Sequence, residues 1–186
     1  MVEDDRRRTT TVVVMGVSGS GKTTVAKELV ARLGWVYAEG DDFHPPANVE
    51  KMRSGHALTD ADRWPWLNSI ARWIGEHEAA GVDAVVTCSA LKRAYRDLLR
   101  DSHPSVWFAH VDVSPEILRD RLGRRTGHHM PASLLDSQLA TLEALDPDEP
   151  GEVIPGNEPA DEVVEHLLDV LRRHDRLPGG ILEEER

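Results

Sequence analysis

The sequence predicts an α/β fold in which helices cover a five-stranded parallel sheet. Short apolar runs alternate along the chain with segments whose apolar residues recur at helical spacing. The first run, Thr11–Met15, is β-branched and uncharged, as expected of a strand buried on both faces. The 186 residues are 40% hydrophobic and contain no internal repeat or linker. We therefore expect one three-layer α/β/α domain over 1–186, with a core of about 11–173 between flexible tails at 1–8 and 177–186.

In the first half of the chain, apolar spacing separates helices from strands. Apolar residues at helical intervals predict a helix over Lys22–Leu33, and a short apolar run predicts a strand at 35–38. The polar segment 39–62 contains prolines and has room for only one short helix. Asp62 is predicted to cap the following helix, with Pro65 in its first turn, where proline is tolerated.

In the second half, the strands are predicted at 84–88, 106–111 and 152–154. A helix is predicted over 91–100, after the first of these strands. Another begins at Ser114, because Ser114 followed by Pro115 is the residue pattern of a helix N-terminus. A last amphipathic helix is predicted over Ala160–Arg173.

Composition excludes several classes of function. The formal net charge of −11 argues against nucleic acid as a main partner, because nucleic-acid-binding surfaces are normally basic. The single cysteine, Cys88, rules out a disulfide within the chain and is expected to be a small core residue. No apolar run approaches the ~18 residues of a membrane helix, and the charged N-terminus lacks the pattern of a signal peptide. We therefore expect a cytoplasmic protein with no membrane partner, and a homodimer is compatible with the sequence.

Residues 16–23, GVSGSGKT, match the phosphate-binding loop pattern G-x-x-x-x-G-K-[ST] at each fixed position. Glycines let the backbone N–H groups converge on phosphate oxygens, and the following helix adds its positive end. Lys22 would neutralise the β- and γ-phosphates of ATP, and the Thr23 hydroxyl would hold Mg²⁺. The strand before the loop and the helix after it argue against a chance glycine-rich turn. The expected nucleotide-binding residues here are Gly16, Ser18, Gly19, Ser20, Gly21, Lys22, Thr23 and Thr24.

The acid that a kinase needs is expected after the second strand. The third strand ends in Thr87-Cys88, without the Asp of a Walker B strand, and a guanine-reading N-K-x-D motif is absent. Asp41 follows the second strand, and the carboxyl ends of parallel strands share one crevice. There Asp41 would orient a substrate hydroxyl, accept its proton and help to hold Mg²⁺. The alternatives are that Asp41 and Asp42 are plain loop acids, or that Asp112 is the acid.

Two basic groups are predicted at the same edge of the sheet. Ser89 and Lys92 follow the third strand, where they could bind a hydroxyl and an anion, with Arg96 one turn further on. Four arginines between positions 119 and 125, followed by two histidines, predict a lid over about 121–131 that brings positive charge to a transition state. An exposed basic helix face is the alternative for both groups.

Taken together, these residues resemble the small bacterial gluconokinases of the P-loop type. The resemblance covers about 11–173. It implies a nucleoside-kinase-like fold, related to shikimate and adenylate kinases, that transfers phosphate from ATP with Mg²⁺ to D-gluconate. The tail after Arg173 and the loop 155–159 depart from the pattern. The resemblance rests on 16–23, 40–45 (GDDFHP), 48–55 (NVEKMRSG), 58–63 (LTDADR), 65–67 (PWL), 88–92 (CSALK), 95–100 (YRDLLR), 127–128 (GH), 137–138 (SQ) and 141–143 (TLE).

The resemblance also implies residue roles. Catalysis falls to Lys22, Asp41 and Arg124, and metal binding to Thr23 and Asp41. By similarity with adenylate kinases, Arg121 would stack on adenine and Arg124 or Arg125 would reach phosphate. There are two alternatives to a gluconokinase. One is another small-molecule kinase, such as a shikimate kinase, and the other is an ATP-binding regulatory module without transfer activity. Substrate contacts are expected at Asp41, His44, Lys51, Arg53, Arg63, Ser89, Lys92 and Gln138.

Overall fold

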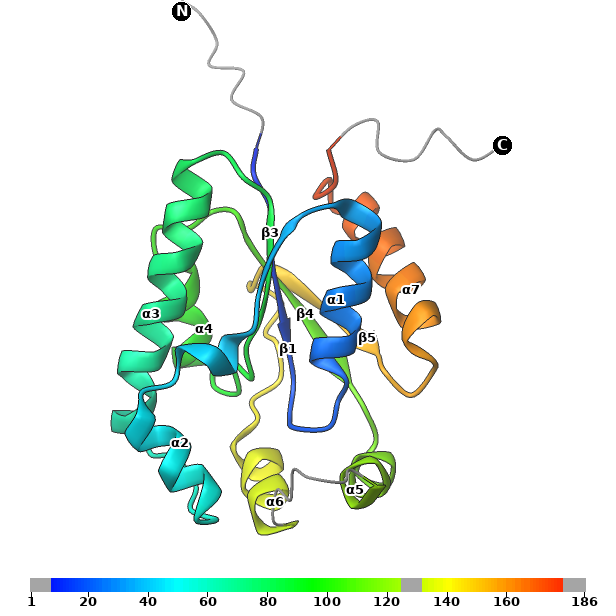
Figure 1. Ribbon diagram of the computed structural model, residues 1–186. Helices are drawn as coiled ribbons and strands as arrows, with labels where there is room; N and C mark the ends of the chain where they lie inside the picture. Colours follow the sequence, from blue (N-terminus) through cyan, green and yellow to red (C-terminus); the bar gives the residue numbers. More distant parts are fainter. Residues whose placement is uncertain (1–7, 125–131, 179–186) are drawn as a thin grey trace, which may run out of the picture.

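The computed structural model describes residues 8–124 and 132–178, and it contains the expected five-stranded parallel sheet (Figure 1). The strands are β1 (Thr11–Met15), β2 (Val36–Ala38), β3 (Ala84–Thr87), β4 (Val106–Asp112) and β5 (Gly151–Pro155). Their order is β2-β3-β1-β4-β5, so β1 lies at the centre. Val13 of β1 pairs with Val86 of β3 and with Phe108 of β4. The loop that follows β1 therefore emerges in the middle of the carboxyl edge of the sheet.

Helices cover both faces of the sheet, as a parallel sheet requires. Figure 1 shows α1 and α7 on one face and α3 and α4 on the other, with α2, α5 and α6 beyond the carboxyl edge. The first and last described residues lie toward the opposite end. The helices are α1 (Lys22–Leu33), the 3₁₀ helix η1 (Gly40–Phe43), α2 (Pro46–Arg53), α3 (Asp60–Ala79), α4 (Arg93–Arg100), α5 (Pro115–Arg124), α6 (Ala132–Thr141) and α7 (Ala160–Arg173).

The start of α3 corrects one prediction. Thr59, not Asp62, caps the helix: its side chain accepts a hydrogen bond from the Asp62 N–H, and the Asp62 carboxylate accepts one from the Thr59 N–H. This reciprocal arrangement is a capping box, and Asp62 occupies its third helical position. Pro65 consequently lies inside the helix rather than in its first turn.

The other predicted boundaries differ from those in the structure by at most two residues. Two elements of the structure were not predicted. One is the 3₁₀ helix at 40–43, and the other is α6, which follows residues 125–131, a range outside the described part of the chain. Arg96 is not part of an exposed basic face, because its side chain is fully buried against Glu149. The fifth strand and the last helix are confirmed, and Cys88 is buried as expected.

Candidate active site

The phosphate loop joins β1 to α1 at the centre of the carboxyl edge. Gly16 has a φ of 142°, and a Cβ there would lie 2.8 Å from the Val111 carbonyl oxygen, so glycine is required on two grounds. Lys22 is the first residue of α1, and its Nζ donates to the Val17 carbonyl at 3.0 Å. The loop thus brings backbone N–H groups, a helix N-terminus and one ammonium group together.

Two acids follow β2, and sequence reasoning missed the first of them. Glu39 accepts hydrogen bonds from the Thr23 hydroxyl at 2.8 Å, from the Tyr37 hydroxyl at 2.6 Å, and from Thr87. Burial favours the protonated acid, but these hydrogen bonds outweigh it and hold the pKa of Glu39 below its usual value. Glu39 is therefore a fixed carboxylate beside the Thr23 hydroxyl. Its signal in the sequence was its place directly after a strand that runs beside β3.

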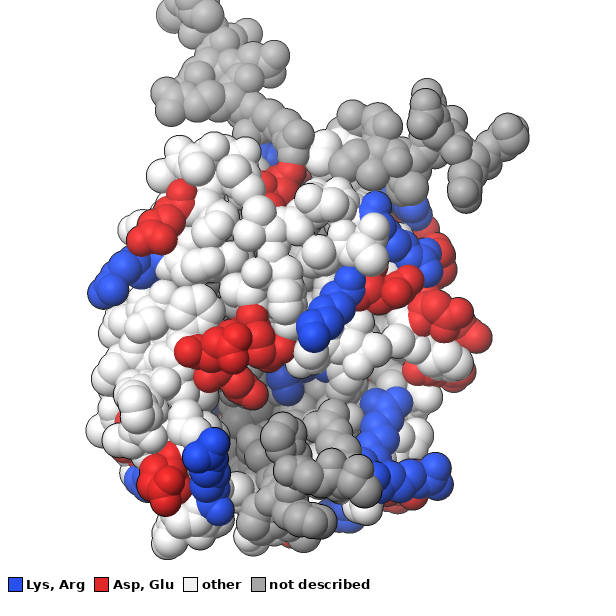
Figure 2. Space-filling model, viewed as in Figure 1, with Lys and Arg blue, Asp and Glu red and all other residues white. Residues whose placement is uncertain are grey.

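Asp41 is the second acid, and η1 presents it to the site. Gly40 lies so close to β3 that a Cβ would be 1.8 Å from the Thr87 carbonyl oxygen, and Trp66 Nε1 donates to the Gly40 carbonyl at 2.7 Å. Burial raises the pKa of Asp41, with the Lys22 charge opposing it, but solvent still reaches most of the carboxylate and limits this effect. Figure 2 shows acidic side chains gathered over η1, where Asp41 and Asp42 are both exposed.

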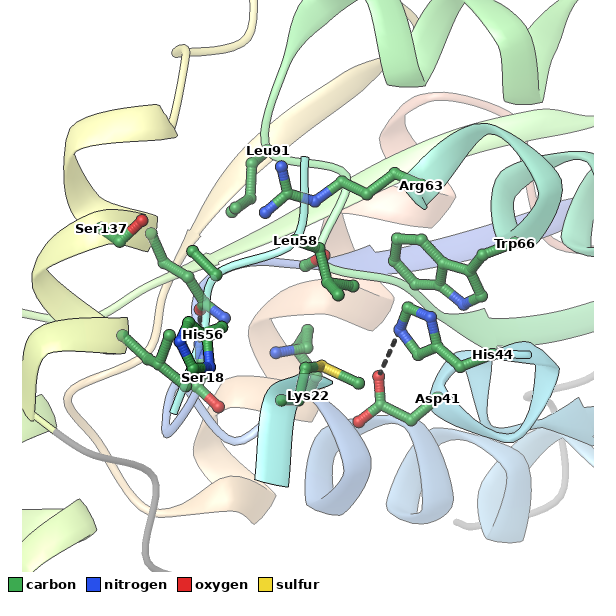
Figure 3. A pocket seen from close by; sticks show the side chains of 15 residues that line it. Ser18, Lys22, Asp41, His44, His56, Leu58, Arg63, Trp66, Leu91 and Ser137 are labelled. Atoms are coloured by element: carbon green, nitrogen blue, oxygen red, sulfur yellow. Dashed lines mark hydrogen bonds and ion pairs between the residues drawn. The ribbon is translucent and has the colours of Figure 1, made fainter. Parts of the chain in front are cut away.

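His44 stands between Asp41 and the protein interior. Its ring stacks on Trp66 with 4.2 Å between centroids, and its Nε2 lies 3.9 Å from Asp41 Oδ1 (Figure 3). Burial, together with the positive charge of Arg63, lowers the pKa of His44 to about 4. His44 is therefore neutral at pH 7 and can only exchange hydrogen bonds with a ligand.

Asp41, His44 and Trp66 line a pocket whose volume is about 670 Å³ including its open mouth. In Figure 3, Arg63 reaches across the pocket from α3, above Trp66 and His44. The pocket brings together seven of the expected site residues: Ser18, Lys22, Asp41, His44, Arg63, Ser89 and Gln138. It also includes residues that were not expected: Met52, His56, Ala57, Leu58, Trp66, Leu91, Leu134 and Ser137.

Three expected substrate residues do not line this pocket. Lys51 binds the Asp62 carboxylate at 2.6 Å, and Lys92 binds Asp60 at 3.1 Å, so both ammonium groups are held at the start of α3. Arg53 is exposed at the end of α2. Arg63 is the arginine of the pocket: its Nη1 donates to the Tyr95 hydroxyl at 3.0 Å, and its guanidinium lies 5.5 Å from the centre of the Tyr95 ring.

A second cavity opens on the other side of the phosphate loop. It is lined by Gly19, Ser20, Gly21, Thr24, Val25, Arg121, Arg124, Gly156, Glu158, Pro159, Ala160 and Val163. Arg121 donates to the Gly156 carbonyl at 3.1 Å and to the Gly19 and Ser20 carbonyls at 3.4 Å, so it joins α5 to both walls. Arg124 pairs with Asp120 at 3.1 Å, while Arg125 and the two histidines after it lie outside the described residues.

The oxygen groups at Thr23 fit a hard divalent cation. No three His, Cys, Asp or Glu side chains converge on a metal-binding position within residues 8–124 and 132–178. Magnesium ions in kinases need no such cage, because one or two protein oxygens and the substrate phosphates complete their shell. The Thr23 hydroxyl and the ionised Glu39 carboxylate are such a pair. Glu39, which was not predicted, is better placed for this role than Asp41, because Glu39 touches Thr23.

A phosphate loop between two cavities, with an acid and an arginine in one of them, defines a P-loop phosphotransferase. The fold agrees: a shikimate kinase from Aquifex aeolicus, 16% identical, superposes with a TM-score of 0.57, covering 89% of this chain and 98% of that one. A gluconokinase from Sinorhizobium meliloti superposes with a TM-score of 0.80 at 44% identity, over 90% of this chain and 94% of that one. No helix in the described ranges is long and apolar enough to cross a membrane.

Sequence comparison narrows the class. The family described as "AAA domain" matches residues 12–145. A gluconokinase from Gluconobacter oxydans is 56% identical over 88% of this chain and 92% of its own length. The thermoresistant gluconokinase of Escherichia coli is 36% identical over 87% and 93%. The chain belongs to the gluconokinase family.

Proposed function

We propose that this protein transfers the γ-phosphoryl group of ATP to the primary hydroxyl of D-gluconate, giving ADP and 6-phosphogluconate. The observation that carries the proposal is the position of the phosphate loop, whose Ser18 and Lys22 line one cavity and whose Gly19, Ser20 and Gly21 line the other. Relatives that are named gluconokinases and match most of the chain supply the substrate class. We also propose that the reaction takes place in the cytosol.

The cavity beside α7 takes the nucleotide. Its walls join the phosphate loop, Arg121 and the loop before α7, and the last of these includes Gly156 and Pro159. Adenine and ribose lie there, which leaves the phosphate chain to run along the loop N–H groups toward Ser18 and Lys22. The Lys22 ammonium group then balances the charge of the phosphoryl group in transit.

Thr23 and Glu39 would hold Mg²⁺ at the phosphates, where the ion neutralises developing charge on the phosphate oxygens. The Tyr37 and Thr87 hydroxyls keep the Glu39 carboxylate oriented toward Thr23. Thr23 and Glu39 are therefore oriented to hold the ion before any substrate reacts.

Asp41 acts on the acceptor hydroxyl. The hydroxyl oxygen forms a bond to the γ-phosphorus while the bond from that phosphorus to the ADP oxygen breaks, and the hydroxyl proton passes to Asp41. His44, 3.9 Å from Asp41 and neutral, is placed to hold the substrate hydroxyls without competing for this proton. The apolar walls formed by Leu58, Leu91 and Trp66 limit the water around the reacting atoms.

Arg63 receives the carboxylate at the other end of gluconate. Its bond to the Tyr95 hydroxyl and its place over the Tyr95 ring hold the guanidinium plane in position. A guanidinium group can meet a carboxylate through two parallel hydrogen bonds, which an ammonium group cannot do. Lys51 and Lys92 are already paired with Asp62 and Asp60, so we do not assign them to the substrate carboxylate.

The direct test is ADP release by the purified protein with ATP and Mg²⁺, in the presence and absence of D-gluconate. We expect release to depend on gluconate and to match the formation of 6-phosphogluconate. Nucleotide binding without gluconate-dependent release would show an ATP-binding module instead of an enzyme and would refute the proposal.

A further inference from the structure

A side chain of α6, that of Gln138, contacts the phosphate loop. Gln138 Oε1 accepts a hydrogen bond of 2.7 Å from the backbone N–H of Ser18. Because a backbone N–H can only donate, the carboxamide must turn its oxygen toward Ser18. The orientation of the amide is thereby fixed, and Nε2 is its other polar atom.

The Gln138 side chain, which carries Nε2, lines the pocket of Figure 3 that we assign to gluconate, called the substrate pocket below. Gln138 borders this pocket together with Ser18, Lys22 and Asp41. Within the described part of the chain, no group accepts a hydrogen bond from Nε2. Ser18 lines the substrate pocket, whereas the next three loop residues line the nucleotide cavity. Gln138 therefore lies at the border that a phosphoryl group crosses during transfer.

The segment directly after α6 is held to the wall of the same pocket by hydrogen bonds. The Glu143 N–H donates to the Leu91 carbonyl at 2.7 Å, and the Glu143 carboxylate accepts from the Arg93 N–H at 2.7 Å. Arg96, fully buried, donates to the Glu143 carbonyl at 3.1 Å and to Leu91 at 3.3 Å. Leu135 of α6 is also buried. Gln138 is consequently presented by a supported helix, as a preorganised donor must be.

We propose that Gln138 is a catalytic residue whose Nε2 donates a hydrogen bond to an oxygen of the phosphoryl group in transit, while Oε1 keeps it attached to the phosphate loop. This inference rests on the proposed function, because it names a further group for the same transfer. Gln138 neither gains nor loses a proton in this role. It supplies a neutral donor in addition to the Lys22 ammonium group, in the pocket that both residues line.

Two variants separate the two ends of the amide. Gln138→Glu keeps an acceptor for the Ser18 N–H and removes the donor, whereas Gln138→Met removes both polar groups without adding charge. We expect kcat to fall about 100-fold in both, since one lost transition-state donor typically has that effect. KM for gluconate should stay within about threefold, because Nε2 contacts the phosphoryl group and not gluconate. Affinity for the ATP analogue AMPPNP should fall relative to affinity for ADP.

The matched control is Ala140→Glu, which adds the same charge to the same helix at an exposed position. It should leave kcat and both affinities unchanged, and thermal melting of all variants checks that they are folded. A Gln138→Met variant with wild-type kcat would overturn the proposal. So would a raised KM for gluconate at unchanged kcat, which would make Gln138 a substrate contact only. If the wild-type protein does not phosphorylate gluconate, the proposed function fails, and the ratio of AMPPNP to ADP affinity still reports on Gln138.

Discussion

The two acids after β2 differ in what surrounds them, and on that ground we propose different roles for them. Glu39 is held by three hydroxyl groups, including that of Thr23, while Asp41 faces the substrate pocket and keeps contact with solvent. The sequence predicted Asp41 from its place at the carboxyl edge, and the same signal applied to Glu39. Glu39 went unrecognised because its hydroxyl partners come from three separate segments, which a pattern along one segment does not reveal.

Asp41→Asn should lower kcat at least about 100-fold while affinity for ATP stays within a few-fold, because the variant loses the proton acceptor but none of the phosphate contacts. Asp42→Asn is the matched control, since it removes the same charge from the next residue. Asp42 does not line the pocket, so its substitution should change kcat little. Steady-state kinetics of the two variants provide the comparison, and equal losses would contradict the role of Asp41.

His44 should make the folded state sensitive to acid. Its pKa is lowered to about 4 from 6.5, so between these values the unfolded chain binds a proton that the folded protein excludes. Stability is therefore complete above pH 6.5 and falls as the pH drops toward 4, by roughly 3 kcal/mol in all. Two charged groups lie near the ring: the Arg63 charge helps to lower the pKa of His44, and the Asp41 carboxylate lies 3.9 Å from His44 Nε2.

The measurement is urea unfolding of the wild type and of His44→Phe across this pH range. Phenylalanine keeps an aromatic ring against Trp66 but does not titrate. Other groups, including the buried His110, titrate in both proteins, so the difference between the two isolates His44. An identical pH dependence in the two proteins would show that His44 is not held neutral by the fold.

At the scale of elements, the predicted strands and helices are largely confirmed, and the differences come from contacts between distant segments. Asp62 had the residue type of a helix cap, but Thr59 three residues earlier completes a capping box with it. Arg96 looked like part of a solvated basic face because its partner, Glu149, lies 53 residues further along the chain. Helical spacing alone cannot show which charged residue will be buried with a partner.

Breaking the Arg96–Glu149 pair should therefore destabilise the fold strongly. Both side chains are fully buried, and Arg96 also donates to carbonyl oxygens in the β3–α4 loop and after α6. Glu149→Ala leaves an uncompensated buried guanidinium group, a change that typically costs about 3–5 kcal/mol. Denaturant unfolding measures this loss.

Asp148→Ala is the control for Glu149→Ala. Asp148 is the adjacent acid and pairs with Arg93, but its side chain is mostly exposed. Exposed ion pairs contribute about 0–1 kcal/mol, so this variant should unfold close to the wild type. If the two alanine variants lose similar stability, the buried Arg96–Glu149 pair contributes no more to folding than the exposed pair, and the prediction is wrong.

For the whole molecule, the order of the strands decides where chemistry can occur. β1 is central, so the phosphate loop, the β2–η1 turn and the β3–α4 loop reach the same edge and enclose the substrate pocket. This convergence was predictable from the alternation of strands and helices. Which cations face the pocket was not, because Lys51 and Lys92 are claimed by acids at the start of α3 while Arg63 is directed inward.

The central claim is that this edge recognises a sugar acid through Arg63 and phosphorylates it. The most direct test is kcat/KM for D-gluconate, D-glucose and shikimate under identical conditions, with wild type and Arg63→Ala. We expect D-glucose, which lacks the carboxylate, to be at least about 100-fold poorer, because Arg63 would then be left unpaired. Arg63→Ala should raise KM for gluconate about 10- to 100-fold with little change in KM for ATP. Equal turnover of glucose or shikimate and gluconate by the wild type would contradict the account.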